Sequence, residues 1–474
     1  MSFQMTRMAR TGVGGLLLAI AAALPAAAQE AAPAVAPAAV TPEAVYVFNS
    51  FSFLIHGALV MFMAAGFAML EAGLVRSKNV ATICLKNIAL YSIAGIVFYL
   101  VGYNLMYGGD SLYIGSFSIW SADDTAALAE VPSYDAGYAS GSDWFFQMVF
   151  VATAASIVSG TVAERTRLWP FLLFSALLSA FIYPIAGSWV WGGGWLSEMG
   201  FSDFAGSTLV HSVGGWAALS GAIIIGARHG KYRPDGGINP MPGSSLPLAT
   251  LGTFILWLGW FGFNGGSQLA LGSAADVVGM AGVYLNTNLA AAGGVLASMI
   301  TCQVLYRKVD LSMALNGAIG GLVSITADPS SPAPGLAIII GAIGGLLVTL
   351  AVPMFDRLKI DDVVGAISVH LVAGIWGTIA VPLSNADASF SVQLIGIVAY
   401  GVFTVVASSI VWLAIKYTIG IRPSVADETM GMDQAELGME AYPEFGVGAM
   451  RLSGMTGAGA PGGAGALAMQ QEKA

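Results

Sequence analysis

Charged residues are scarce in this chain of 474 residues. Only 9% of the residues are charged, whereas 56% are hydrophobic. A soluble globular protein carries about 25% charged residues, so this chain has too few charges to cover a surface surrounded by water. Its 61 glycines fit the same picture, because glycine lets apolar helices approach closely where lipid gives no hydrophobic drive. The composition therefore predicts a polytopic membrane protein embedded in a lipid bilayer.

Cysteine, histidine and positive charge are also in short supply. Cys84 and Cys302 are the two cysteines of the chain, and both lie in apolar runs, so no disulfide framework or zinc ribbon can be built from them. The net charge of −9 argues against nucleic-acid binding. The sequence contains no HExxH motif, no GxSxG elbow and no Gly-rich phosphate loop between a strand and a helix. We therefore expect neither an enzyme nor a bound cofactor.

The N-terminal segment has the pattern of a targeting sequence. Arg7 and Arg10 precede an apolar stretch that ends in three alanines at positions 26–28. This order predicts a secretory signal peptide over residues 1–28, with a retained first helix as the alternative. The Ala/Pro-rich residues that follow predict a disordered linker over 29–44. The mature N-terminus would then lie outside the cytoplasm, as in a protein of a bacterial inner membrane.

Eleven segments are long and apolar enough to be predicted as membrane spans, since a spanning helix needs roughly 20 mostly apolar residues. They make up an all-α transmembrane domain over 45–420, followed by a polar cytoplasmic tail over 421–474. The eighth span is the shortest and is rich in glycine. The predicted spans are 46–74, 80–107, 144–163, 169–190, 205–227, 247–268, 276–306, 312–327, 335–354, 363–383 and 392–418.

The basic residues give the orientation of these spans. Every second junction carries lysine or arginine, and the junctions between them carry none. Such asymmetry is typical of the positive-inside bias, so we expect the N-terminus outside and the C-terminus inside. Lys86 is an exception, because it falls inside the second span. The basic junction residues are Arg76, Lys78, Arg165, Arg167, Arg228, Lys231, Arg233, Arg307, Lys308, Arg357 and Lys359.

The junctions predicted to lie outside are acidic. An acidic face without lysine would concentrate small cations near a pore mouth. The alternative is that these loops are acidic only because basic residues are excluded from them, and the sequence does not decide between the two. The acidic residues are Asp110, Asp123, Asp124, Glu130, Asp135, Asp143, Glu198 and Asp203.

Two histidines occupy matching places in the fifth and tenth spans. Asp203 precedes His211 by eight residues, and Asp362 precedes His370 by eight. Because five is an odd number, a five-helix unit that is repeated once must be inverted. Inverted repeats usually hold the transported species near the midplane of the membrane. The pattern therefore predicts an inverted five-helix repeat, followed by one final helix.

An ionisable residue inside a span is a functional-site candidate, because its burial in hydrocarbon is costly. The alternative for His211 and His370 is a hydrogen bond between helices that serves packing alone. A metal site is disfavoured, because two histidines lack the third protein ligand that catalytic zinc has. We interpret His56 as structural or vestibular, and His229 as solvated on a basic loop.

Several runs of residues resemble the ammonium transporter (Amt/Mep/Rh) family. The run from Asp203 to His211 is similar to the family signature around its first pore histidine. Its DFAGS start, and the WFGFNGGS run at 260–267, look more like the Amt branch than the Rh branch. The matches occur in family order and extend over nearly all of the mature chain. Further matches are the runs 71–79, 191–194, 286–288 and 361–370.

The resemblance implies a homotrimer with one pore in each subunit. It implies a vestibule that recruits ammonium at Trp191, Phe150 and Ser267. It also implies a gate formed by Phe150 and Phe263. The pore would be lined by His211, His370 and Trp260, with Asp203 and Phe146 in supporting positions.

The chemistry of these residues agrees with that implication. Aromatic faces attract a compact cation, but carrying an intact ion through a dry apolar lumen would be costly. We therefore hypothesise that ammonium loses its proton at the outer gate and that ammonia passes along neutral histidines. The substrate would be ammonium or ammonia, with methylammonium as a further candidate. The alternatives are an electroneutral ammonia or gas channel of the Rh type, and an ammonium sensor.

The tail also resembles the family. The run from Gly431 to Tyr442 is similar to a cytoplasmic motif that contacts neighbouring subunits in the family and helps a PII-class nitrogen signalling protein close the pore exits. The resemblance therefore implies a PII-class partner. The sequence departs from the motif at Leu437, where the family has histidine, and at Met439, where it has glutamate. The run beyond Ser453 is of low complexity and is predicted to be disordered.

Overall fold

The computed structural model of this chain describes residues 40–443. The predicted signal peptide, most of the predicted linker and the low-complexity C-terminal run lie outside the described residues. Helix α1 begins at Pro42, inside the segment predicted as linker, because Thr41 caps the helix and Pro42 suits its first position. The regular structure between residues 40 and 443 is helical, and no strand is found there.

Within residues 40–443, nine helical segments are long and apolar enough to cross a membrane. Some are continuous α-helices, and others include a π-helical turn. They are α1 (Pro42–Leu74); Ser77–Tyr107, with α2 (Val80–Val97) and α3 (Tyr103–Tyr107); α4 (Ser140–Thr161); Leu168–Ser188, with α5 (Leu168–Leu177) and α6 (Tyr183–Ser188); Ser207–Ile225, with η4 (Ser207–Ser212) and α8 (Val213–Ile225); α9 (Leu246–Gly266); α10 (Ala274–Tyr306); α12 (Pro334–Arg357); and α14 (Phe390–Thr418).

Two further apolar segments are shorter. They are α11 (Leu311–Ile325) and Ile367–Leu383, which contains η5 (Ile367–Val372) and α13 (Ala373–Ala380). They coincide with the eighth and tenth predicted spans. From Ala314 to Ile325 every residue of α11 is buried, and the helix contacts α9, α10, α12 and α13. A helix surrounded by protein does not have to match the thickness of lipid, and this explains its short length.

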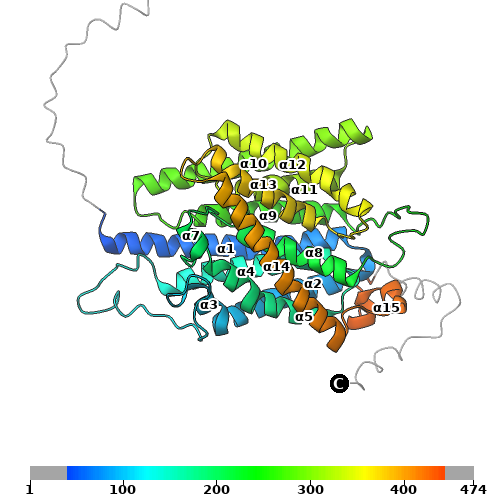
Figure 1. The fold of residues 1–474 in the computed structure, drawn as a ribbon, viewed down its shortest axis with the longest axis horizontal. Coiled ribbons are helices and arrows are strands. Elements are labelled where there is room, and N and C mark those ends of the chain that lie inside the picture. Colours follow the sequence, from blue (N-terminus) through cyan, green and yellow to red (C-terminus); the bar gives the residue numbers. More distant parts are fainter. Residues whose placement is uncertain (1–39, 444–474) are drawn as a thin grey trace, which may run out of the picture. The chain divides into compact units, whose positions relative to one another are not determined.

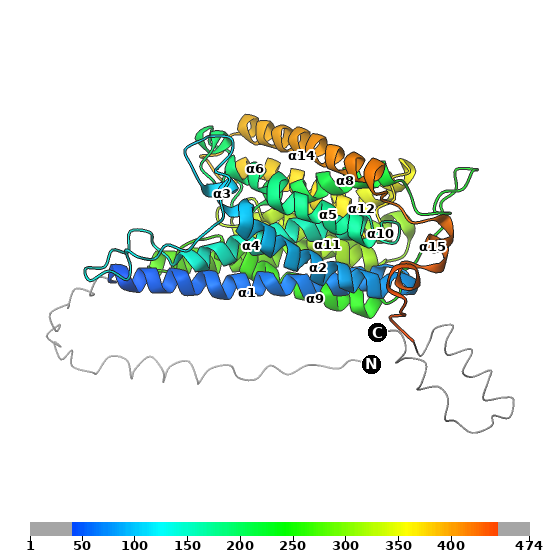
Figure 2. The same ribbon diagram turned by 90° about the horizontal axis from the view of Figure 1, so that it is seen from below.

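Glycine allows the long helices to pack backbone against backbone. Helices α1 and α9 lie side by side along one face of the bundle (Figure 2), and a Cβ atom on Gly252 of α9 would lie 2.2 Å from the backbone nitrogen of Leu70. Between α10 and α12, a Cβ atom on Gly341 would lie 2.0 Å from the carbonyl oxygen of Ala290. These approaches leave no space for a side chain, which is how apolar helices associate in lipid.

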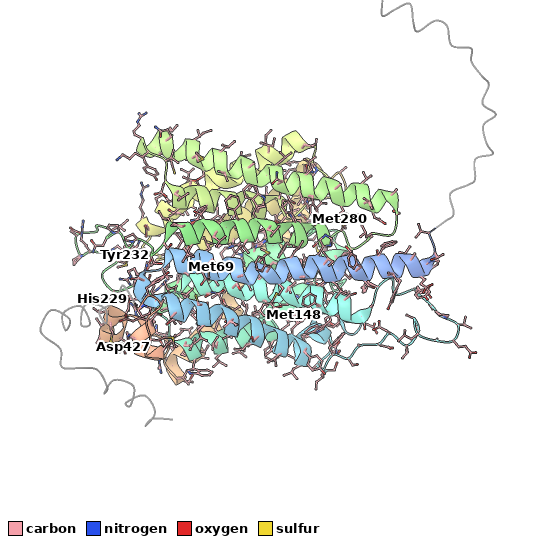
Figure 3. All side chains as sticks on the ribbon, turned by 180° about the vertical axis from the view of Figure 1, so that it is seen from behind. Met69, Met148, His229, Tyr232, Met280 and Asp427 are labelled. Carbon is pink, nitrogen blue, oxygen red and sulfur yellow. The ribbon has the colours of Figure 1, made fainter. Side chains whose placement is uncertain are left out.

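The two ends of the bundle differ in composition. We call the end that carries α15 (Val425–Met430) the tail end, and the end that carries residues 108–139 the loop end (Figures 1 and 2). Helix α14 crosses the bundle from one end to the other on the face opposite α1. Figure 3 labels His229, Tyr232 and Asp427, which all lie at the tail end. The junctions predicted to be basic meet at this end.

A buried charge cluster joins four of these junctions. The Arg228 guanidinium donates from Nε to Oδ2 of Asp361 at 2.8 Å and from Nη2 to Oδ1 at 2.9 Å. Its Nη1 lies 3.4 Å from Oε2 of Glu164, which also accepts from Nε of Arg76 at 2.6 Å. Burial alone would raise the pKa of the Asp361 carboxyl. Hydrogen bonds from Arg228 and nearby positive charges nevertheless hold that pKa well below its usual range.

Replacement of Arg228 by Met should destabilise the fold strongly, because the buried carboxylates of Asp361 and Glu164 lose their partner. We expect a loss of about 3–5 kcal/mol in the free energy of unfolding, measured by thermal unfolding in detergent. The matched control is Arg233→Met. Arg233 pairs with Asp235 in solvent, and its replacement should cost less than about 1 kcal/mol. Equal stability of the two variants would contradict a structural role for the cluster.

Candidate functional site

The two histidines of the predicted repeat are positioned by the same device. Oδ2 of Asp203 accepts hydrogen bonds from the backbone nitrogens of Thr208 and Leu209, at 3.0 and 2.8 Å, at the start of η4. The Asp362 carboxylate accepts from the backbone nitrogens of Ala366 and Ile367, at 3.1 and 2.7 Å, at the start of η5. Each carboxylate satisfies N–H groups that have no partner within the helix. The equal spacing of aspartate and histidine in the two segments therefore corresponds to the same capping geometry in the structure.

These π-helical turns bring the two histidines into contact. The Nδ1 atoms of His211 and His370 lie 3.2 Å apart, and the rings are stacked at 19° with their centroids 5.2 Å apart. Both side chains are buried. In a neutral imidazole one ring nitrogen donates and the other accepts, so one Nδ1 carries the hydrogen and the other accepts it. The pair can therefore hand a proton from one ring to the other.

Aromatic rings continue this stack toward the loop end. The Trp260 ring stacks on His211 with a centroid distance of 5.0 Å, and the Phe263 ring lies 5.2 Å from His211. The ring centroids of Phe263 and Phe150 lie 4.1 Å apart. Trp260 is held in place by its Nε1, which donates to Oγ1 of Thr326 at 2.8 Å. The two phenylalanines predicted to form a gate are therefore in direct contact, next to the histidine pair.

A cavity of about 350 Å³ lies on the loop-end side of the two phenylalanines. Its walls include Trp191, Phe150 and Ser267, together with Phe146. The Trp191 indole donates to the carbonyl oxygen of Asp203 at 2.9 Å, which fixes its ring. The Ser267 hydroxyl donates to the carbonyl of Phe263 at 2.8 Å, and this leaves lone pairs on its oxygen to accept a hydrogen bond. The cavity brings together all three residues predicted for recruitment.

Asp143 lines the same cavity, a role that the sequence did not single out. Its carboxylate is buried and accepts hydrogen bonds from the Tyr103 hydroxyl and from Nε2 of Gln147. The sequence counted Asp143 as one of several acids in the outer loops. Its spacing was the available signal, because Asp143, Phe146 and Phe150 fall at i, i+3 and i+7 of α4, on one face of the helix.

A second, smaller cavity lies on the tail-end side of the histidines. Its volume is about 20 Å³, enough for one water-sized molecule. His370 and Phe67 form part of its wall, together with the apolar side chains of Ile157 and Ile319. Glu71 also lines it. Two cavities, from opposite ends of the bundle, therefore approach the same pair of histidines.

The remaining sequence candidates lie away from this path. The His56 ring contacts Ser52 through Nδ1 and the Tyr284 hydroxyl through Nε2 at 3.1 Å, which favours the structural interpretation. His229 is exposed at the tail end, as predicted. Asp203 is not among the residues that line the loop-end cavity. Its carboxylate caps the start of η4, and its carbonyl oxygen accepts a hydrogen bond from Trp191. Among the described residues, no three His, Cys, Asp or Glu side chains group as a metal site.

A bundle of apolar helices with polar groups along an internal path is typical of a membrane transport protein. Residues 51–442 match the model of the Ammonium Transporter Family. The chain is 41% identical over 423 residues to the ammonium transporter Amt2 of Archaeoglobus fulgidus, an alignment that covers 83% of this chain and 87% of the relative. It is 38% identical to Amt2 of Haloferax mediterranei over 416 residues, covering 82% of this chain and 88% of that one.

Solved structures agree with the sequence matches. A sensor Amt protein superposes with a TM-score of 0.77 at 35% identity, over 84% of this chain and all of that chain. Mep2 of Candida albicans superposes with a TM-score of 0.71 at 26% identity, over 81% and 88% of the two chains. The chain belongs to the ammonium transporter family.

Replacement of Asp203 by Ala should destabilise the protein, because two buried backbone N–H groups lose their acceptor. Each unsatisfied group costs about 1–3 kcal/mol, so we expect a total loss of about 3 kcal/mol in thermal unfolding experiments. Asp310 caps the exposed start of α11, where water can replace the side chain. Asp310→Ala is therefore the matched control and should cost about 1 kcal/mol. A smaller loss in the Asp203 variant than in this control would refute the capping argument.

Proposed function

We propose that the protein is an ammonium transporter that takes up ammonium across the cytoplasmic membrane of a bacterium. The observation that carries the proposal is the stacked pair of His211 and His370, which lies between a wide cavity and a narrow one. The membership of the ammonium transporter family supports this reading of the path. The path would be the pore, and each subunit would contain one.

In the proposed orientation the tail end faces the cytoplasm, because the basic junctions meet there. The short segments α11 and Ile367–Leu383 would count as the eighth and tenth of eleven spans, with the N-terminus outside and the C-terminus inside. The capping aspartates support the inverted repeat. Asp203 holds Trp191 at the loop-end cavity, whereas Asp362 follows Asp361 of the tail-end charge cluster. A signal peptide over residues 1–28 would fit this orientation.

Recruitment would take place in the loop-end cavity. An ammonium ion there would meet the rings of Trp191 and Phe150 and the acceptor oxygen of Ser267. A cation over an aromatic face gains about 0.5–1 kcal/mol when exposed and about 2 kcal/mol when desolvated. The negative charge of Asp143, in the wall of the cavity, would also attract the ammonium ion.

Passage beyond Phe150 and Phe263 would require deprotonation. The centroids of the two rings lie 4.1 Å apart, so no hydrated ion fits between them in this arrangement. A bare ion in the apolar path beyond would lose its solvation at great cost. Neutral ammonia avoids that cost and can hydrogen-bond to the imidazole nitrogens. The proton would follow separately, passed between the two Nδ1 atoms.

Two alternatives remain. An electroneutral ammonia channel of the Rh type would use the same path but leave the proton outside. An ammonium sensor is a second candidate, because a protein named as a sensor Amt protein superposes on this chain with a TM-score of 0.77. A sensor would bind ammonium in the loop-end cavity without appreciable flux. Current, pH change and binding distinguish the three functions.

The tail would regulate transport as part of a homotrimer. Its Asp433 side chain accepts hydrogen bonds from the backbone of Ala81 and Thr82, at the start of α2. Glu436 accepts from the backbone nitrogen of Leu168, at the start of α5. Such contacts suit a tail that reports on the pore-forming helices to a PII-class protein. Met439 is 54% exposed, so the lost glutamate would weaken the charge of that docking surface.

The double variant His211→Ala and His370→Ala should abolish selective ammonium current. A positioned proton-transfer group contributes about 100-fold or more to rate, so the current should fall by at least about that factor. The assay is an ammonium jump applied to proteoliposomes on a solid-supported membrane. The control is His56→Ala, which removes a membrane histidine outside the path. A double variant with undiminished selective current would rule out the relay. A rise in internal pH without current in the wild type would favour the ammonia channel.

Asp143→Asn should weaken recruitment but leave the maximal current nearly unchanged, since the carboxylate attracts the ion without lying beyond the gate. If the carboxylate contributes an attraction of about 1.4 kcal/mol, its loss raises the half-saturating ammonium concentration about tenfold. Asp123→Asn is the matched control, because that acid is exposed on the loop and does not line the cavity. Equal half-saturating concentrations in the two variants would show that Asp143 has no specific role and that the acidic residues attract ammonium only through their summed charge.

A further inference from the structure

Glu71 is a buried acid inside a spanning helix. It lies in the last turn of α1, and its side chain is about 1% exposed. Oε2 accepts hydrogen bonds from the Ser159 hydroxyl at 2.8 Å and from Nδ2 of Asn87 at 3.3 Å. Oε1 has no hydrogen-bond partner among the described residues. A buried carboxylate oxygen without a partner is costly, which points to a ligand or a proton that occupies it.

This carboxyl group faces the path described above. Glu71 and His370 both line the tail-end cavity, whose volume of about 20 Å³ holds one molecule the size of water or ammonia. Gly160 keeps the space open, since a Cβ atom there would lie 2.4 Å from Cγ2 of Val364 and 3.5 Å from Cγ of Glu71. A single small molecule in this cavity would therefore lie between walls that include both His370 and Glu71.

Lys86 places a positive charge near the Glu71 carboxylate without forming an ion pair with it. Its Nζ donates to the carbonyl oxygen of Ser159 at 3.3 Å and lies 4.0 Å from the centre of the Phe171 ring. The structure contains no ion pair between Lys86 and Glu71 among the described residues, and Ser159 links the two through its carbonyl and its hydroxyl. The nearby charge compensates an ionised carboxyl, whereas the apolar walls suit a protonated one. Both protonation states of Glu71 are therefore accommodated.

We propose that Glu71 is the inner proton-transfer residue and the last binding site for the substrate. This inference rests on the proposed function. The proton that leaves ammonium at the outer gate passes along the histidine pair and, through the molecule in the tail-end cavity, protonates the Glu71 carboxylate. Ammonia that has passed His370 then takes this proton. An N–H bond forms, the carboxyl O–H bond breaks, and ammonium leaves toward the tail end. The carboxylate is regenerated, so proton and charge balance.

The competing role is purely structural, because Glu71 also joins α1 to α2 and α4 through its hydrogen bonds. Glu71→Gln keeps the shape and removes proton transfer, whereas Ser159→Ala removes a hydrogen bond and keeps the carboxyl. Proton transfer requires the first variant to lose current and the second to retain it. A structural role makes both variants lose current together with thermal stability.

The experiment compares these variants with the wild type in proteoliposomes on a solid-supported membrane. We expect the ammonium current of Glu71→Gln to fall about 10-fold or more, while an ammonia gradient still raises internal pH. Glu71→Asp keeps a carboxyl at a greater distance, so it should retain part of the current with an altered dependence on internal pH. Wild-type current in Glu71→Gln, or an unaltered pH profile in Glu71→Asp, would overturn the proposal.

Folding is controlled by a paired variant. If Glu71→Gln fails to fold because Lys86 is left without a counter-charge, the double variant with Lys86→Met removes both charges. The folded double variant should also lack current, and a wild-type current in it would overturn the role of Glu71. Absence of both current and pH change in the wild type would instead refute ammonium transport itself. The two failures are thus distinguishable.

Discussion

Each histidine of the central pair depends on a carboxylate that binds the backbone at the start of its helix. Asp203 and Asp362 each accept two N–H groups, and a π-helical turn follows in both cases. The unsatisfied amides at a helix start would be costly inside an apolar bundle. The two caps therefore fix where each helix begins, and with it the position of the imidazole. Without that constraint the Nδ1 atoms would not meet at 3.2 Å.

The surroundings of this pair follow from the cost of charge in apolar media. Aromatic rings adjoin the histidine pair toward the loop end, and one carboxylate lines each of the two cavities. Asp143 lies at the loop-end cavity and Glu71 at the tail-end cavity. Under the proposed transport function, this distribution would stabilise an ion at both ends of the path and disfavour it in the middle. The proposed passage of neutral ammonia between two cation sites rests on this distribution.

The tail end is organised by charge as well, but for a different purpose. Arg228 and Asp361 pair where two junctions meet, and the tail segment lies on the same end (Figure 3). Glu428 contacts Arg422 through its carboxylate and Lys78 through its carbonyl oxygen. The junctions and the tail therefore form one polar layer. A partner that moved the tail would act directly on the starts of α2 and α5.

Much of the site was predictable from local features and from motifs. The eight-residue spacing predicted both histidines, and the resemblance placed Trp191, Phe150 and Phe263, which the structure brings to one side of the pair. Asp143 was found only as one acid among several. Glu71 appeared in a matching motif without a role. Hydrogen-bond partners and cavity walls decide what an acid does, and neither can be read from a single sequence.

The sequence by itself determined most of the helical segments and the basic junctions, because hydropathy and charge patterns extend over a few neighbouring residues. It could not determine which short segments reach across the membrane, since the length of α11 reflects the helices around it. Only the tertiary structure brought together His211 and His370, which are 159 residues apart. The tertiary structure also shows that Oε1 of Glu71 has no hydrogen-bond partner among the described residues. Neither feature can be read from the sequence, because contacts between distant segments depend on how all the helices pack.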